Sequence, residues 1–113
     1  MSKKGEAFTA DAETPWAPSG GQGIRRKVLC HDDAVMLVRF AFEAGAVGAQ
    51  HSHPHKQVSV IESGVFDVTI DGKTKRLKSG DSYLVAPNLV HGAAAVEQGV
   101  IIDVFSPHRE DFL

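Results

Sequence analysis

The sequence of 113 residues has little of several features that mark large classes of protein. Its single cysteine, Cys30, excludes an intrachain disulfide, as expected in a reducing compartment. No segment approaches the ~20 apolar residues of a transmembrane helix. The first residues, MSKKGEAFTADAE, also lack the apolar core of a secretory signal. We therefore expect a cytoplasmic protein that does not interact with membranes.

The sequence also lacks a large excess of charge of either sign. Twelve Lys and Arg residues stand against 14 Asp and Glu residues, giving a net charge of −2. The one basic run, at residues 73–78, has no interleaved aromatic residues and fits a solvated hairpin strand. Because nucleic-acid-binding surfaces require a basic stripe, we expect no nucleic-acid partner.

Amphipathic helical periodicity is also missing, apart from a possible turn at 107–112. From Ile24 onward, short β-branched runs alternate with turn residues, which is the pattern of an all-β protein with little or no helix. We predict about nine strands, among them Ile24–Cys30, Val35–Phe42, Val58–Ile61, Val65–Ile70, Lys73–Leu77, Ser82–Val85, His91–Val96 and Val100–Ser106.

The turns between these strands favour a closed architecture. Asp71-Gly72 is the dipeptide of a two-residue type I′ hairpin, and we expect further turns at 62–64 and a bend at 45–48. Many short strands close most readily as a β-barrel or double-sheet jelly roll, because closure removes exposed edges. We expect residues 1–23 to form a tail and a turn-rich segment, and 24–113 to form one barrel domain with a C-terminal extension.

Three of the six histidines gather in the stretch Gly45–Gly64. His51, His53 and His55 are followed at once by Gln57. Alternate residues of a strand share a face and lie ~6.6 Å apart, so His51 and His53 could converge on one metal ion. Gln57 has the same parity and offers an amide oxygen. His91 begins a later strand and could complete the site.

Because of Pro54, the sequence does not determine the whole ligand set. Proline cannot donate to a sheet ladder and often marks a bulge, which would change which of His53, His55 and Gln57 points inward. The alternative is a group of surface histidines on a polar turn. We favour a metal site, and neutral imidazole and amide ligands suit borderline divalent ions such as Zn, Ni, Fe(II), Mn or Co.

These residues resemble the first motif of the cupin superfamily, G-x5-H-x-H-x3/4-E-x6-G, with glutamine in place of glutamate. The matching positions are Gly45, His51, His53, Gln57 and Gly64. The second cupin motif, G-x5-P-x-G-x2-H-x3-N, matches only at Gly80 and His91. Its Pro, Gly and Asn positions hold Ala86, Asn88 and Ala95. The resemblance covers about residues 24–106 and implies a cupin-type β-barrel.

A narrower resemblance is to the KdgF family of pectin and alginate degradation. It rests on TPW (14–16), GGQGIRRKVL (20–29), HSHPHKQ (51–57) and the C-terminal GVIIDVFSPHREDFL (99–113). It implies metal-dependent conversion of 4,5-unsaturated uronate monosaccharides to linear 5-keto-4-deoxyuronate by ring opening and tautomerisation. It also implies one divalent ion held by three histidines and one glutamine, and a homodimer.

The C-terminal segment supplies candidates for catalysis. Asp103 shares a strand face with Ile101 and Phe105, so burial would raise its pKa and suit it to proton transfer. With the resemblance, Asp103 and Arg109 are the predicted catalytic residues. A guanidinium binds a carboxylate in bidentate fashion, so Arg109 is also a substrate-binding candidate, and Arg39 is another. Phe105 could form an apolar wall for the sugar or belong to the core.

Three other functions fit parts of the pattern. An Fe(II)-dependent cupin dioxygenase would more often keep an acidic ligand or three histidines alone, and Gln57 argues against it. The second is a non-catalytic sugar-binding cupin module of the kind that senses sugars for a transcription factor, but the sequence shows no helix-turn-helix. The third, a storage or scaffold barrel with a vestigial metal site, would not need Asp103 beside Phe105.

Overall fold

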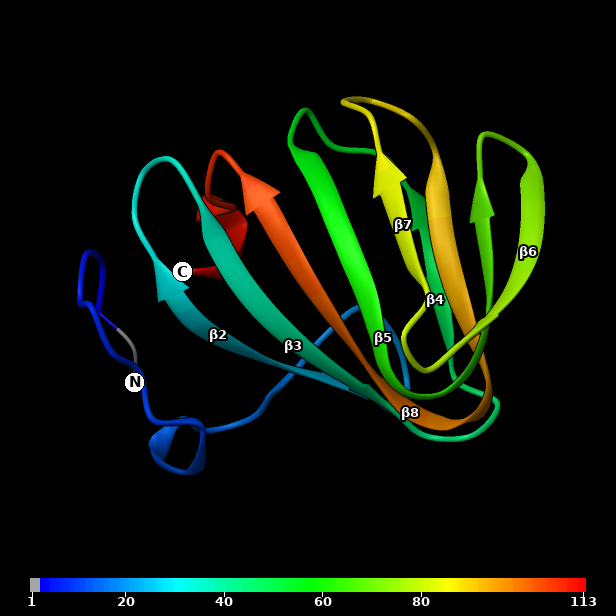
Figure 1. Cartoon of the computed structure of the whole chain (residues 1–113), viewed down its shortest axis with the longest axis horizontal. Helices are drawn as coiled ribbons and strands as arrows, with labels where there is room; N and C mark the ends of the chain where they lie inside the picture. The colour runs from blue at the N-terminus through cyan, green and yellow to red at the C-terminus, as the bar shows by residue number, and fades with distance from the viewer. Residues whose placement is uncertain (1–2) are drawn as a thin grey trace.

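The computed structural model describes residues 3–113, and its regular structure consists of antiparallel strands apart from two short 3₁₀ turns (Figure 1). Eight strands follow in order: β1 (Ala17–Pro18), β2 (Ile24–His31), β3 (Met36–Phe42), β4 (Val47–His51), β5 (Lys56–Ile70), β6 (Lys73–Lys78), β7 (Ser82–Val85) and β8 (His91–Ser106). Two single 3₁₀ turns, η1 (Asp11–Glu13) and η2 (Glu110–Phe112), lie outside the strands. No helix in residues 3–113 has the length and apolar character needed to cross a membrane.

The two longest strands organise the fold. β5 and β8 pair along their whole length, and β2, β3, β8 and β5 run side by side (Figure 1). The second half of β8 pairs with β3, whereas its first half pairs with β4. The first half of β5 pairs with β7 and its second half with β6. β5 and β8 thus extend through both halves of a double-sheet jelly roll, which confirms the predicted all-β class.

The prediction of separate strands on either side of residues 62–64 was wrong. Residues 56–70 form one strand, and 91–106 form another, with register shifts between Ile61 and Phe66 where the pair bends. Gly64 permits this bend because it has φ 84°, and a Cβ there would lie 2.5 Å from the carbonyl oxygen of Gln98. The residues that looked like a turn therefore form a bulge inside a strand.

Other turns form where the sequence predicts them. Asp71 and Gly72 have φ of 49° and 79°, as a type I′ hairpin requires. Asn88 has φ 68° at the position where the second cupin motif has glycine. Asparagine is one of the few residues that tolerate this left-handed conformation, so the turn before His91 survives the substitution. The predicted bend at 45–48 is shorter than expected, because β4 already begins at Val47.

Alternating side chains of these strands fill the interior with two apolar clusters. One consists of Ile24, Phe42, Ala46, Ile61, Phe66, Val68, Ala95 and Ile101. The second consists of Met36, Val38 and Phe105. Phe42 and Phe66 meet edge to face with ring centroids 5.1 Å apart. Because these residues occupy the inner face of β3 and β8, they fix which side chains of those strands point inward.

The N-terminal segment runs along the outside of β2. β1 pairs with β2 through Ala17 and Arg26, and the Gly5 N–H donates to the carbonyl of His31. Trp16 is half-buried, with the cationic groups of Arg25 and Lys27 each 4.6 Å from its ring centroid. The division of the chain at residue 23 stays a prediction from the sequence.

Candidate functional site

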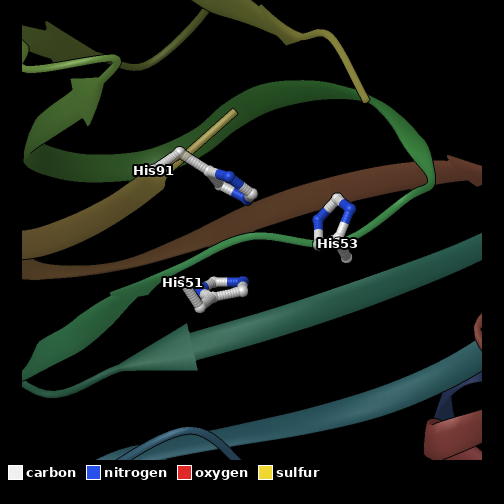
Figure 2. Close-up of side chains that lie close together, drawn as sticks. All are labelled: His51, His53 and His91. Atoms are coloured by element: carbon white, nitrogen blue, oxygen red, sulfur yellow. The ribbon is translucent and has the colours of Figure 1, made fainter. Parts of the chain in front are cut away.

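Three histidines meet at one end of the jelly roll. His51 is the last residue of β4, His91 is the first of β8, and the two are opposite each other in the β4–β8 register. His53 lies in the loop that joins β4 to β5, so the expectation that His51 and His53 share a strand face was wrong. Figure 2 shows the three rings turned toward a common space, and their potential ligand atoms lie within 4.8 Å of one another. His55 is not part of this group.

The backbone determines which nitrogen of each ring is free to bind a metal. Each Nδ1 atom lies close to a backbone carbonyl oxygen. The distance is 2.9 Å from His51 to Ala49, 3.0 Å from His53 to His55 and 2.9 Å from His91 to Leu89. A carbonyl can only accept a hydrogen bond, so each Nδ1 carries the proton. A neutral ring then has its lone pair on Nε2, the atom left for a metal ion.

Gln57 brings an oxygen to the same point. Its Oε1 lies 3.0 Å from His53 Nε2 and 3.1 Å from His91 Nε2. With Nδ1 protonated, both imidazole atoms are acceptors, as is the amide oxygen. Acceptors that converge without a proton between them repel one another unless a cation lies among them. The donor set therefore fits a divalent transition metal ion.

Burial keeps two of these rings in the metal-binding form. His53 and His91 are 6% and 4% exposed. Burial lowers the pKa of His53, and it lowers the pKa of His91 to about 4. Both are neutral at pH 7, and an ion can bind them without first displacing a proton.

Ser59 links the histidine site to Asp103. Gln57 Nε2 donates to Ser59 Oγ at 2.9 Å, and Ser59 donates to Asp103 Oδ1 at 2.5 Å. The amide nitrogen thus has its acceptor on the side away from the histidines, which fixes the amide orientation. Asp103 is 7% exposed, and burial raises its pKa to about 7, against the opposing effects of Ser59 and Arg109.

Replacing Ser59 by alanine is expected to weaken metal binding roughly 10–100-fold, the usual effect of losing a residue that orients a metal ligand. Without an acceptor at position 59, the Gln57 amide can rotate and donate to His53 or His91, which removes its oxygen from the site. Competition with a chromophoric chelator would measure the affinity. Ser59→Thr keeps the hydroxyl and is the matched control. Equal metal affinity in Ser59→Ala and the wild type would contradict this role.

A cavity of about 320 Å³ opens beside the histidines. Its lining includes His51, Gln57 and His91 together with Asp103, Phe105 and Arg109. Phe105 is 1% exposed, and its ring centroid lies 5.6 Å from that of His53. One cavity is therefore lined by the predicted C-terminal residues and by all the predicted metal ligands except His53. His53 lies next to this cavity, where it contacts Gln57 and Phe105.

Arg109 already has an acidic partner at the cavity. Its Nε and Nη2 donate to the two carboxylate oxygens of Asp111 at 3.3 and 2.7 Å. Its guanidinium carbon lies 5.2 Å from the Phe105 ring centroid and 4.1 Å from that of Phe112. Arg109 thus presents a partly paired positive charge, and its side chain is 13% exposed.

The structure does not bring Arg39 to this cavity. Phe40 and Phe42 line it, and strand alternation directs Arg39 to the opposite face of β3. There its guanidinium pairs with Asp11 at 2.5 Å and Glu62 at 3.3 Å. The predicted substrate-binding role of Arg39 therefore has no support from its position.

Three cavity-side residues escaped the sequence analysis: Arg26, Ser59 and Tyr83. Strand parity could have found them. Ser59 lies between Gln57 and Ile61 on the buried face of β5, and Tyr83 is opposite Ser59 in the β5–β7 register. Burial and the charge of Asp103 raise the pKa of Tyr83, so its hydroxyl stays protonated.

Comparisons with known proteins agree with this geometry. The cupin domain family matches residues 38–105. The pectin degradation protein KdgF of Dickeya dadantii (strain 3937) is 44% identical over 108 residues, which are 94% of this chain and 97% of that protein.

Two solved structures are similar over nearly the whole chain. An RmlC-like cupin from Shewanella frigidimarina NCIMB 400 is 41% identical, with a TM-score of 0.93, over 97% of this chain and 98% of that one. KdgF from Halomonas sp. is 36% identical, with a TM-score of 0.90, over 96% of this chain and 99% of that one.

Proposed function

The chain belongs to the cupin family and, within it, to the KdgF family, and on this basis we propose that it converts 4,5-unsaturated uronate monosaccharides to linear 5-keto-4-deoxyuronate. The observation that carries the proposal is the single cavity, about 320 Å³, that combines a three-histidine group with a buried carboxylate and an arginine. Its volume suits a monosaccharide acid.

We propose that His51, His53, Gln57 and His91 hold one divalent ion from the group Zn, Ni, Fe, Mn and Co. When bound, such an ion supplies Lewis-acid stabilisation of negative charge on the sugar oxygens. The neutral donors leave the ion's full positive charge uncompensated. This favours an anionic substrate in the cavity.

Asp103 is the proposed proton-transfer group. As a base it takes the proton of the anomeric hydroxyl, so C1 becomes a carbonyl as the bond from C1 to the ring oxygen breaks. The electron pair of that bond passes to the ring oxygen and forms the enol or enolate at C4 and C5. Asp103 then returns a proton to C4, and C5 becomes the ketone. No atom is gained or lost, so the reaction is an isomerisation that needs no further reactant.

Arg109 and Phe105 are proposed to position the substrate. The Arg109 guanidinium attracts the uronate carboxylate in the cavity, in competition with Asp111. Phe105 presents its buried ring between the histidines and Arg109 and forms an apolar wall for one face of the sugar.

The direct test of the proposal uses unsaturated uronate monomer, made by digesting pectin or alginate oligomers. The conjugated enol absorbs in the ultraviolet, and its loss follows the reaction above the slow spontaneous rate. Metal-loaded protein is expected to accelerate the loss in proportion to its concentration. Absence of any acceleration would overturn the proposal.

We also propose that the protein is a cytoplasmic homodimer. The outer face of the sheet carries a row of apolar side chains in register across β7, β5, β8 and β3: Leu84, Val58, Val104 and Leu37. Leu84 and Val58 are 58% and 50% exposed, and a second copy would cover them. Light scattering that gives the mass of one chain would contradict the dimer.

A further inference from the structure

Arg26 is a cation on the inner face of a barrel strand. β2 alternates, so Ile24, Arg26 and Val28 share one face, and Ile24 and Val28 pack against the apolar clusters. Arg26 lines the same cavity as the histidines and Asp103. A charged residue between two inward apolar ones has to be explained by something in the cavity.

No acidic residue among 3–113 forms an ion pair with Arg26. Among the described residues Arg26 makes one hydrogen bond, from Nη1 to the carbonyl oxygen of Pro18 at 3.3 Å. Its guanidinium carbon lies 4.2 Å from the Phe112 ring centroid. The rest of its donor fork is available to a ligand, unlike that of Arg109, which two bonds hold to Asp111.

Arg26 and Arg109 form a pair of cations around one aromatic ring. Both guanidinium groups stack on Phe112, at 4.2 and 4.1 Å from its centroid. Burial and the neighbouring charge of Arg109 lower the pKa of Arg26, whereas the negative charge of Asp111 opposes this shift. A bound carboxylate would meet both positive charges, and Asp111 is hydrogen-bonded to Arg109 and not to Arg26.

We propose that Arg26 binds the substrate carboxylate together with Arg109 and makes the cavity specific for sugar acids. The inference rests on the proposed function, because it names a residue that recognises the acid group of the same substrate. The planar fork of Arg26 suits bidentate contact with a carboxylate. Asp111 keeps Arg109 partly neutralised, so Arg26 supplies the free donors for the incoming anion.

The kinetic test compares an acid with its neutral counterpart. In Arg26→Gln we expect KM for the unsaturated uronate to rise about 10–100-fold with kcat within about threefold, since hydrogen bonds to a charged group are lost. For the corresponding 6-carboxamide, which has no negative charge, KM should change less than about threefold. An equal loss with both compounds, or no loss with either, would overturn the proposal.

Arg25 provides the matched control. It is the neighbouring arginine on β2, but it faces outward and stacks on Trp16. Arg25→Gln removes the same charge from the protein and should leave KM for the uronate unchanged. Arg26→Lys keeps the charge without the bidentate fork, so its KM for the uronate should lie between those of Arg26→Gln and the wild type.

An equilibrium measurement separates this inference from the proposed reaction. Calorimetry or ligand-observed NMR with D-galacturonate and D-galactose reports binding without turnover. Wild-type protein and Arg25→Gln are expected to prefer the acid, and Arg26→Gln is expected to lose at least about tenfold of that preference. If the wild type does not isomerise unsaturated uronate but shows this Arg26-dependent preference, the proposed reaction fails and the role of Arg26 stands. Equal preference for the acid in Arg26→Gln and the wild type would overturn the proposed role of Arg26.

Discussion

Replacing Asp103 by asparagine is expected to lower kcat about 10²–10⁴-fold, the usual contribution of a positioned proton-transfer group. Asparagine keeps the size of the side chain and can still accept the hydrogen bond from Ser59, but it cannot take up the anomeric proton. The fold and the histidine group should persist. The measurement is the initial rate of ultraviolet absorbance loss with metal-loaded variant and wild type.

The metal content of the same preparation is the control for this result. Asp103→Asn should bind one metal ion per chain, as the wild type should, because Asp103 contacts the histidine site only through Ser59 and Gln57. Full activity in the metal-loaded variant would remove Asp103 from the chemistry. Loss of both metal and activity would assign it to metal binding.

The raised pKa of Asp103 also determines the pH dependence. The base must be ionised, so kcat is expected to fall as the pH drops through the pKa of Asp103, which is about 7 before metal binds. A nearby divalent ion favours the carboxylate and moves this acidic limb to lower pH. The pH–rate profile of the loaded enzyme should therefore bend at or below pH 7. A profile with no acidic limb at any pH at which the protein stays folded would contradict the assignment.

Replacing His91 by alanine is expected to abolish stable metal binding and to lower activity about 10²–10³-fold, because a metal ion contributes several kcal/mol of charge stabilisation. His91 is buried and meets both His51 and Gln57, so its loss opens the centre of the ligand set. Elemental analysis after dialysis gives the metal content. Chelator treatment of the wild type should reproduce the loss, and added metal should restore the activity.

His55 is the matched control within the same histidine-rich stretch. The structure uses its backbone carbonyl to hold His53 Nδ1, and alanine keeps that carbonyl. His55→Ala should therefore retain the metal. Loss of metal in His55→Ala together with retention in His91→Ala would contradict the ligand set.

The all-β class and most strand positions could be predicted from the sequence because strand alternation and turn chemistry are local properties. The hairpin at Asp71-Gly72 needs only two residues with positive φ, and it forms. The continuity of β5 could not be predicted, because Glu62, Ser63 and Gly64 have turn composition. Only their pairing with β8, which is distant in sequence, shows that they form a bulge.

Some residues of the candidate site could likewise be predicted from the sequence, and others could not. Asp103 was predictable because parity places it between Ile101 and Phe105, and the structure buries all three. The position of His53 was not, because the chain leaves β4 after His51 and a loop, not a strand, places the ring. Strand parity alone directs Arg39 away from Phe40 and Phe42, whereas its partner there, Asp11, lies 28 positions away in the sequence and could not be predicted.

The most direct test of the central claim is the rate of unsaturated uronate ring opening with metal-loaded wild type, metal-free wild type and metal-loaded Asp103→Asn. Acceleration by the first alone is the expected result, because the reaction is proposed to need both the ion held at His51, His53, Gln57 and His91 and the base at Asp103. Three rates equal to the spontaneous rate would contradict the proposed function, and equal acceleration by all three would contradict the proposed site.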